Sequence, residues 1–428
     1  MQQKPTKLQK EVAGLRVALL SLMDAVVGEP HALRGLLPIG GRSILRHQLG
    51  LAMALGCARI VVLAETLTGD LVALQHAAEA GGARFHVIAS ARALAPLVAA
   101  EDELLVLGEG LLAMPEDALH LLGDGPVILT MPVETGLVAG FERIDINSAS
   151  AGAMVLPGKL VAGLGDLPGD WNPGSALLRI AVQSRVIQRE LPGLLLDQGR
   201  WRLIRDEAEA HHAEPGWVRL HTAGAHLRSP GLWIAANVVR WLGPALLHAG
   251  TRPYVIALAA AITALLAAGA GWFGWPSIGF ALLALAWLMQ QVAGLLARVE
   301  RDSLLAWSGR APLDVAAEWG LDAVFIMLCA WRSEIPAATG VPWGIAWFPP
   351  VVLFLLLRLL WRLQPDEGWT WWLTDRFVAG VMLTGFSMLL PFDFVLRALV
   401  VSLMVAGLIF ARLGDAQGED IAGRKKQA

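Results

Sequence analysis

Short apolar runs alternate with helical patterns over residues 16 to about 225. The helical pattern is clearest in SILRHQLGLAMALG, between the first two runs. Strands separated by helices in this way predict a soluble α/β domain with a doubly wound, mostly parallel sheet. Such sheets bind ligands at the carboxyl ends of their strands. The runs that predict strands are RVALLSL, RIVVLAE, ARFHVIA, ELLVLGEG and GPVILTM.

The pattern changes beyond about residue 230. From Pro253 to Ala297 the sequence has no Asp, Glu, Lys or Arg, and this stretch is too long for one membrane span of about 20 residues. Gly274 to Pro276 interrupt it, which predicts two spans. With the later apolar stretches, the pattern predicts an all-α, six-helix transmembrane domain. The expected spans lie near 253–273, 277–297, 315–331, 343–361, 375–390 and 392–411.

A transitional segment separates the two patterns. Residues 231–248 contain Arg240 and two Trp, which is typical of an amphipathic helix at a membrane interface. The polar tail after the last span is expected to be disordered. The predicted organisation is a flexible N-terminus at 1–15, the α/β domain at 16–228, the interfacial helix at 229–250, the transmembrane domain at 251–413 and the tail at 414–428.

Composition agrees with a partly membrane-embedded protein. The chain is 55% hydrophobic and only 17% charged, whereas soluble proteins average about 25% charged residues. A net charge of -3 gives no footprint for nucleic acid. Cys57 and Cys329 define no disulfide framework, which fits a cytosolic soluble part. The polar, basic N-terminus lacks the apolar core of a signal peptide, so the soluble half is expected to stay in the cytoplasm.

Basic residues predict the orientation of the spans, because cytoplasmic loops are enriched in Lys and Arg. They place the α/β domain, both termini and the 298–312 loop in the cytoplasm, as in a multi-pass protein of a bacterial-type inner membrane. Asp375 and Arg376, at the start of the fifth span, are expected to pair with each other or with a head-group phosphate. The basic residues that flank the spans are Arg240, Arg252, Arg298, Arg301, Arg310, Arg358, Arg362, Arg412, Arg424, Lys425 and Lys426.

The membrane half carries a family resemblance. TRPYVIAL, GWPSIGFALLALAWL, the G-x-x-A-R ending at Arg298 and LDVAAEWGLDAVF together resemble the CDP-alcohol phosphatidyltransferase family. Its signature is D-x-x-D-G-x-x-A-R, a spacer, and G-x-x-x-D-x-x-x-D. The resemblance implies six spans and acids that hold two divalent metals beside a CDP pyrophosphate, whose charge the reaction must neutralise.

The signature is only partly kept. Gln290 and Ala293 stand where the first two Asp belong, while Gly294 and Arg298 match. The resemblance then implies that Gln290, Gly294 and Arg298 contact the substrate.

Asp314 matches the third acid of the signature, and Glu318 replaces the fourth. The resemblance implies that these two residues bind Mg²⁺ or Mn²⁺ and carry catalysis, with Glu318 as the base. Asp322 is expected on the same helix face.

The soluble half carries a second resemblance. RGLLPIGGRSILRHQLGLAMALGCARIVVLAE resembles sugar-nucleotide and inositol-phosphate nucleotidyltransferases. Arg34 stands at a phosphate-binding lysine position, a role that arginine can fill. Glu109 follows the strand where a metal-binding Asp is expected, and is either that ligand or a solvated loop acid. The phosphate loop has a single glycine, Gly28. Asp145 and Asn147 are either polar groups of a substrate pocket or turn and cap residues.

The fused order resembles bifunctional proteins that make a CDP-activated polyol and hand it to a phospholipid precursor. We therefore expect a function in phospholipid or polar-lipid head-group synthesis. A phospho-alcohol or phosphatidyl group would be transferred from a CDP-activated donor with release of CMP. The expected partners are a CDP-activated alcohol or CDP-diacylglycerol, a membrane lipid and a second copy in a homodimer. The alternative is a catalytically inactive paralogue that scaffolds or regulates an active enzyme, which would explain why both motifs are altered.

Overall fold

The computed structural model describes residues 14–166, 172–222, 229–248, 253–301, 312–333, 346–363, 372 and 375–408. The predicted tail at 414–428, most of the N-terminus at 1–15 and most of the 298–312 loop lie outside these residues. The chain divides into two compact units. The first runs to Leu220 and the second from His221, apart from a short segment from Val299 that groups with the first.

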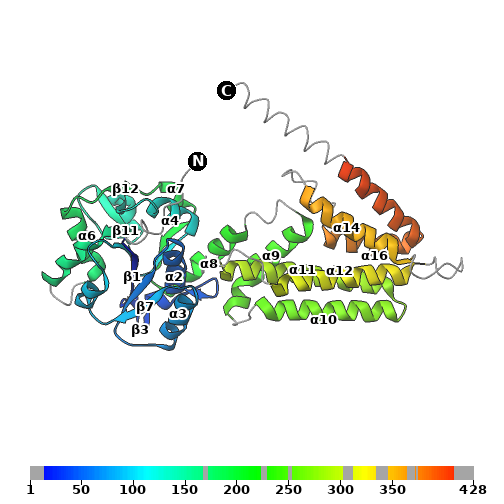
Figure 1. Ribbon diagram of the computed structural model, residues 1–428, viewed down its shortest axis with the longest axis horizontal. Helices are drawn as coiled ribbons and strands as arrows, with labels where there is room; N and C mark the ends of the chain where they lie inside the picture. The colour runs from blue at the N-terminus through cyan, green and yellow to red at the C-terminus, as the bar shows by residue number, and fades with distance from the viewer. Residues whose placement is uncertain are drawn as a thin grey trace, which may run out of the picture. The chain divides into compact units, whose positions relative to one another are not determined.

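The first unit is built on a seven-stranded sheet (Figure 1). Five of its strands are the predicted apolar runs, and the sheet is mostly parallel as expected. The exception is β11, which runs antiparallel to both of its neighbours. The order across the sheet is β12 (Gln188–Glu190), β10 (Val127–Pro132), β11 (Ser148–Pro157), β8 (Glu103–Leu107), β1 (Arg16–Leu22), β6 (Arg59–Ala64) and β7 (Arg84–Ile88).

The sequence pattern did not reveal β11. Its sequence, SASAGAMVLP, begins with small residues rather than the β-branched and aromatic residues that favour strands. Gly152, in its middle, has a φ of +76°. The strand forms because its neighbours β10 and β8 supply hydrogen-bond partners on both edges.

Successive residues of β1 enter two different cores. Ala18 and Leu20 pack into one cluster with residues of α2 (Ile44–Ala54), α3 (Gly69–Ala80) and α4 (Pro115–Leu122). Val17 and Leu19 pack into another with residues of α6 (Pro173–Gln183). This alternation follows from the two-residue period of a strand. Helices therefore cover both faces of the sheet (Figure 1), as in a doubly wound fold.

Smaller elements complete the first unit. β9 (Leu111–Ala113) pairs with β13 (Trp201–Leu203) beside the main sheet. The fully buried Trp201 donates its indole N–H to the carbonyl of Ala151 in β11, at 2.8 Å. The remaining elements are β2 (Ala25–Val26), β3 (Glu29–Leu33), β4 (Pro38–Ile39), β5 (Arg42–Ser43), α5 (Val133–Val138), α7 (Gly193–Asp197), α8 (Glu207–Thr222) and 3-10 segments at Arg34–Leu36, Ala91–Leu97 and Gly158–Asp166.

The second unit is helical. A helix occurs at each of the six predicted spans and at the predicted interfacial segment. Its apolar core centres on Phe280, whose ring stacks on Phe392 with centroids 5.8 Å apart. The helices are α9 (Pro230–His248), α10 (Pro253–Trp272), α11 (Pro276–Arg301), α12 (Pro312–Arg332), α14 (Phe348–Leu363), α16 (Arg376–Leu389) and 392–408.

Among the described residues, two helical segments are long and apolar enough to cross a membrane. They are Pro253–Trp272 and Pro276–Val299. Charged residues interrupt α12, and α14 and α16 are shorter as described. The six-span arrangement therefore stays a prediction.

Candidate functional site

A cavity of about 180 Å³ lies in the first unit, at the carboxyl ends of β1 and β8. The chain leaves β1 for β6 and β7 on one side and returns to β8 on the other. This reversal is the topological switch point, where doubly wound sheets bind ligands. The polar side chains that line the cavity are Ser21, Asp24, Arg34, Glu109, Glu142, Ser150, Asn172 and Ser175.

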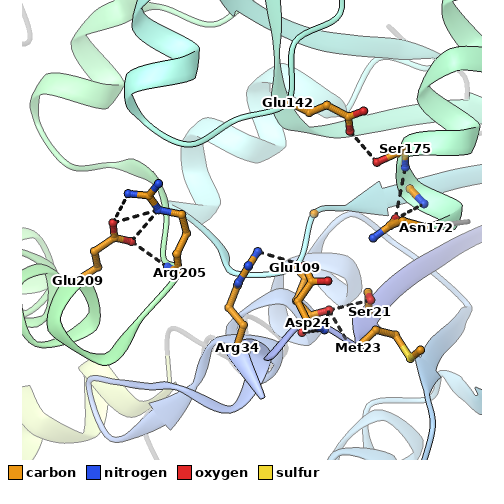
Figure 2. Close-up of polar contacts among 12 residues, drawn as sticks. Ser21, Met23, Asp24, Arg34, Glu109, Glu142, Asn172, Ser175, Arg205 and Glu209 are labelled. Carbon is orange, nitrogen blue, oxygen red and sulfur yellow. Dashed lines mark hydrogen bonds and ion pairs between the residues drawn. The ribbon is translucent and has the colours of Figure 1, made fainter. Parts of the chain in front are cut away.

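Glu109 joins the end of β8 to the loop after β1 (Figure 2). Its Oε2 accepts hydrogen bonds from the Ser21 hydroxyl and the Met23 N–H, each at 2.8 Å. The Asp24 N–H lies 3.1 Å from both carboxylate oxygens. The residue is only 7% exposed, so a solvated loop position does not describe it. Burial raises the pKa of Glu109, and the donated hydrogen bonds oppose this rise.

Two glycines shape the turn that carries Glu109. The Gly108 N–H donates to the Gly152 carbonyl at 2.7 Å, which ties the end of β8 to β11. Gly110 has a φ of +82°, and a Cβ there would overlap the Ile204 carbonyl oxygen. Glycine is therefore required for the chain to turn back and for the carboxylate of Glu109 to face β1.

Arg34 forms the neighbouring wall of the cavity. Its Nη1 lies 3.1 Å from Oδ2 of Asp24, and the side chain of Arg34 is 18% exposed. The structure thus brings Arg34 and Glu109, expected from the nucleotidyltransferase resemblance, into one cavity (Figure 2). Sequence reasoning missed Asp24, which neutralises the Arg34 guanidinium.

The opposite wall comes from the start of α6 and the segment before β11. The Ser175 hydroxyl donates to Glu142 Oε2 at 2.7 Å. Asn172 Oδ1 accepts from the Gly174 N–H at 2.9 Å, and so caps α6. Sequence reasoning did not identify these residues. The available signal was the Asn-Pro pair, since Asn is a preferred N-cap and Pro a preferred first helical residue.

Asp145 and Asn147 do not line this cavity. The Asp145 carboxylate accepts the N–H groups of Asn147 and Ser148, each at 2.8 Å, in an exposed turn. Hydrogen bonds from Ser148 and Asn147 lower the pKa of Asp145. This geometry matches the turn role, and substrate contact by Asp145 stays a prediction. Gly28 also lies apart from the cavity, with a φ of +90° between β2 and β3.

In the second unit, the G-x-x-A-R motif lies in the last turns of α11. Ala293 is buried, Gln290 is half-buried and Arg298 is exposed. A Cβ on Gly294 would meet no described atom within 4 Å. Packing among the described residues therefore does not require a glycine at this position.

The acids of α12 have different environments. Asp314 lies in α12, but its side chain is outside the described residues, and Glu318 is half-buried. Asp322 is 2% exposed and holds two arginines. Its Oδ2 lies 2.7 Å from Arg358 Nη2, and its Oδ1 lies 2.8 Å from Arg376 Nε.

Aromatic rings extend this charged cluster. The Arg358 guanidinium carbon lies 3.5 Å from the ring centroid of Trp319, and that of Arg376 lies 4.8 Å from Trp287. Such cation–π contacts favour arginine in apolar surroundings. Sequence reasoning missed the cluster, although an arginine inside the apolar run of α14 was itself a signal for a buried partner.

Arg376 thus pairs with Asp322 rather than with its neighbour Asp375. Asp375 is buried and accepts the N–H of Gly231 at 2.6 Å and that of Phe377 at 2.9 Å. It therefore caps the first turns of both α9 and α16.

The fit of Mg²⁺ or Mn²⁺ differs between the two candidate sites. Among the described residues, no three His, Cys, Asp or Glu side chains cluster as metal ligands. In the cavity, protein donors engage Glu109 and Arg34 engages Asp24, which does not suit a cation that prefers about six oxygen ligands. At Asp314 and Glu318 metal binding stays a prediction, because the Asp314 side chain lies outside the described residues.

The N-terminal half of the chain is similar in fold to solved structures of other proteins. No protein-family model and no curated protein matches the sequence. A Bacillus anthracis protein assigned as a glucose-1-phosphate thymidylyltransferase, solved with sucrose, is 14% identical with a TM-score of 0.35, covering 47% of this chain and 94% of its own.

Two UDP-glucose pyrophosphorylases are also similar. The one complexed with UDP-glucose is 11% identical with a TM-score of 0.36, covering 48% of this chain and 99% of its own. The one from Acinetobacter baumannii is 11% identical with a TM-score of 0.35. The match covers 48% of this chain and 94% of the Acinetobacter chain. At identities and TM-scores this low, the function of the cavity has to follow from its own residues.

Proposed function

We propose that this protein takes part in polar-lipid head-group synthesis at a membrane. In this proposal the first unit binds a nucleotide or a CDP-activated alcohol. The helical unit then transfers the phospho-alcohol or phosphatidyl group to a hydroxyl of an acceptor lipid or alcohol and releases CMP. The observation that carries the proposal is the convergence of Arg34, Glu109 and the loop after β1 on one cavity at the switch point of the sheet.

The cavity has groups suited to an activated alcohol. The Arg34 guanidinium can hold a phosphate oxygen, in exchange for part of its contact with Asp24. On the opposite wall, Glu142, Asn172 and Ser175 offer acceptors and donors to the hydroxyls of a ribose or a polyol. Both kinds of group face one cavity, as a phosphorylated, hydroxyl-rich ligand requires.

The exposed face of α10 supports a location in a membrane. Tyr254 is 65% exposed at its start, and Trp272 is 72% exposed at its end. At about 1.5 Å per residue, these rings stand roughly 27 Å apart, close to the thickness of a bilayer core. Exposed aliphatic side chains such as Leu258, Ile262 and Leu265 lie between them. Aromatic rings at both ends of an apolar helix are typical of membrane spans.

A specific observation also favours the alternative, an inactive paralogue that scaffolds or regulates an active enzyme. Ala293 and Gln290 remove two of the four acids that the family signature would supply. In the cavity, protein donors already engage the Glu109 carboxylate. Each candidate site therefore has fewer acids available for a metal than its resemblance would supply.

Release of CMP tests the proposal against this alternative. Purified full-length protein in lipid nanodiscs is given Mg²⁺ or Mn²⁺ and either CDP-diacylglycerol with an alcohol acceptor or a CDP-alcohol with a hydroxyl-bearing lipid acceptor. It is expected to release CMP. A variant carrying Asp314→Asn and Glu318→Gln is expected to lose this release, because it lacks the remaining acids of the signature. Wild-type release no greater than that of the variant would reject the transferase and favour the scaffold.

Binding of CTP tests the first unit separately. Arg34→Ala is expected to weaken CTP binding by about tenfold, since charge-assisted hydrogen bonds to phosphate are lost. The measurement is isothermal titration of the full-length protein in detergent. Arg143→Ala, which removes an arginine outside the cavity lining, is the matched control. Equal affinities for both variants would exclude Arg34 as a phosphate ligand.

A further inference from the structure

The loop after β1 forms a compact set of hydrogen-bond donors. The N–H groups of Met23 and Asp24 are consecutive in the chain, and the Ser21 hydroxyl lies two positions before Met23. All three donate to one carboxylate, that of Glu109, at 2.8–3.1 Å (Figure 2). Successive backbone N–H groups that converge in this way form an anion-binding nest.

The nest opens on the cavity and stands beside a cation. Ser21, Asp24, Arg34 and Glu109 all line the cavity. Arg34 reaches the same loop, with Nη1 3.1 Å from Asp24 Oδ2. A phosphate at the nest would thus have backbone donors and a guanidinium within reach, the combination that binds phosphate tightly.

Glu109 competes with such a phosphate for two reasons. Its carboxylate already uses the three donors that the phosphate would need. Its negative charge, which lies near that of Asp24, would also repel a second anion, because like charges at short distance repel each other strongly in a partly buried site. The Gly108–Gly110 turn, with its left-handed Gly110, holds the carboxylate in this position.

We propose that Ser21, Met23 and Asp24 form a phosphate-binding nest that Glu109 occupies as an internal anion. Glu109 therefore lowers the affinity of the cavity for phosphate groups and has to move before one can bind. That the phosphate belongs to a nucleotide rests on the proposed function. That the nest binds a phosphate group does not depend on the proposed function.

Pyrophosphate binding tests this inference. Inorganic pyrophosphate is titrated into the full-length protein in detergent, with a chelator of divalent cations present. Glu109→Ala is expected to bind it about tenfold more tightly than wild type or better, because three donors become free. Glu142→Ala removes a carboxylate from the opposite wall and leaves the nest filled. It is expected to change the affinity by less than about threefold, through weaker repulsion alone.

Two other results for these variants would overturn the inference. Equal gains for Glu109→Ala and Glu142→Ala would show a general charge effect. A loss of affinity in Glu109→Ala would make Glu109 part of the anion site. If Glu109→Ala does not fold, Glu109→Gln keeps the side-chain length with one acceptor oxygen. It is then expected to bind pyrophosphate more tightly than wild type, and an unchanged affinity would overturn the nest.

The two proposals fail separately. Tighter pyrophosphate binding by Glu109→Ala, with no CMP release by wild type, keeps the nest and rejects the transferase. CMP release by wild type, with no gain in pyrophosphate affinity, rejects the nest alone.

Discussion

Replacing Asp322 with alanine is expected to destabilise the helical unit by about 3–5 kcal/mol. This carboxylate is 2% exposed and contacts two guanidinium groups, those of Arg358 and Arg376. Without it, two cations remain in an apolar bundle with their main partner removed. Breaking a buried ion pair costs far more than the pair contributes, because the remaining charge stays desolvated.

The measurement is thermal or SDS-induced unfolding of the full-length protein in detergent. Asp393→Ala is the matched control, because Asp393 is a half-buried acid of the same unit that accepts the Ser333 hydroxyl at 2.8 Å. It is expected to cost less than Asp322→Ala, because water can reach a half-buried position and solvate the groups that the carboxylate leaves behind. Replacing the cluster together, with Asp322→Leu, Arg358→Met and Arg376→Met, is expected to recover most of the stability. An Asp322→Ala protein as stable as Asp393→Ala would contradict the pairing.

Replacing Trp201 with alanine is expected to destabilise the first unit by about 3–5 kcal/mol, as large-to-small changes in a core do. Trp201 is fully buried, and its indole N–H bonds the Ala151 carbonyl in β11. The neighbouring Gly152 lines the cavity. The change is therefore expected to weaken CTP binding as well as folding.

Pulse proteolysis of the full-length protein in urea measures this loss, by following the N-terminal fragment. Trp201→Phe is the control: it keeps an aromatic ring in the core and loses the indole hydrogen bond and part of the ring volume. Its expected cost, about 1–3 kcal/mol, comes from the carbonyl left without its donor and from the smaller ring. If alanine and phenylalanine gave equal losses, packing of the ring would not be the main contribution of Trp201.

Local pattern predicted much of the first unit. The apolar runs that became β1, β6, β7, β8 and β10 are bounded by turn residues, so their period and length indicate strands directly. β11 was not predicted, because its small residues have a low intrinsic preference for strands and form one only beside neighbouring strands. Arg34 and Glu109 could be expected in one site, because the nucleotidyltransferase resemblance implies that one binds phosphate and the other a metal. Glu109 directly follows β8, whereas Arg34 follows the small strand β3.

Side-chain partners could not be predicted in the same way. The donors to Glu109 come from the end of β1 and the loop after it, 85–88 residues earlier in the chain. No local pattern encodes that contact. The spacing of the α12 acids placed Asp322 with Asp314 and Glu318 on one helix face. It could not show that Asp322 meets arginines from α14 and α16. Such pairings depend on tertiary packing, which cannot be predicted from the periodicity of a single helix.

The shared cap at Asp375 has a consequence for synthesis of the chain. Gly231, near the start of α9, receives its acceptor from a residue 144 positions later. At about 5–20 residues per second, a ribosome needs roughly 7–30 s to cover that distance. During this interval the first turn of α9 lacks its final partner, whereas the first unit lacks at most its short segment from Val299. The helical bundle therefore closes late, and a chain that stops before Asp375 leaves its first helix uncapped.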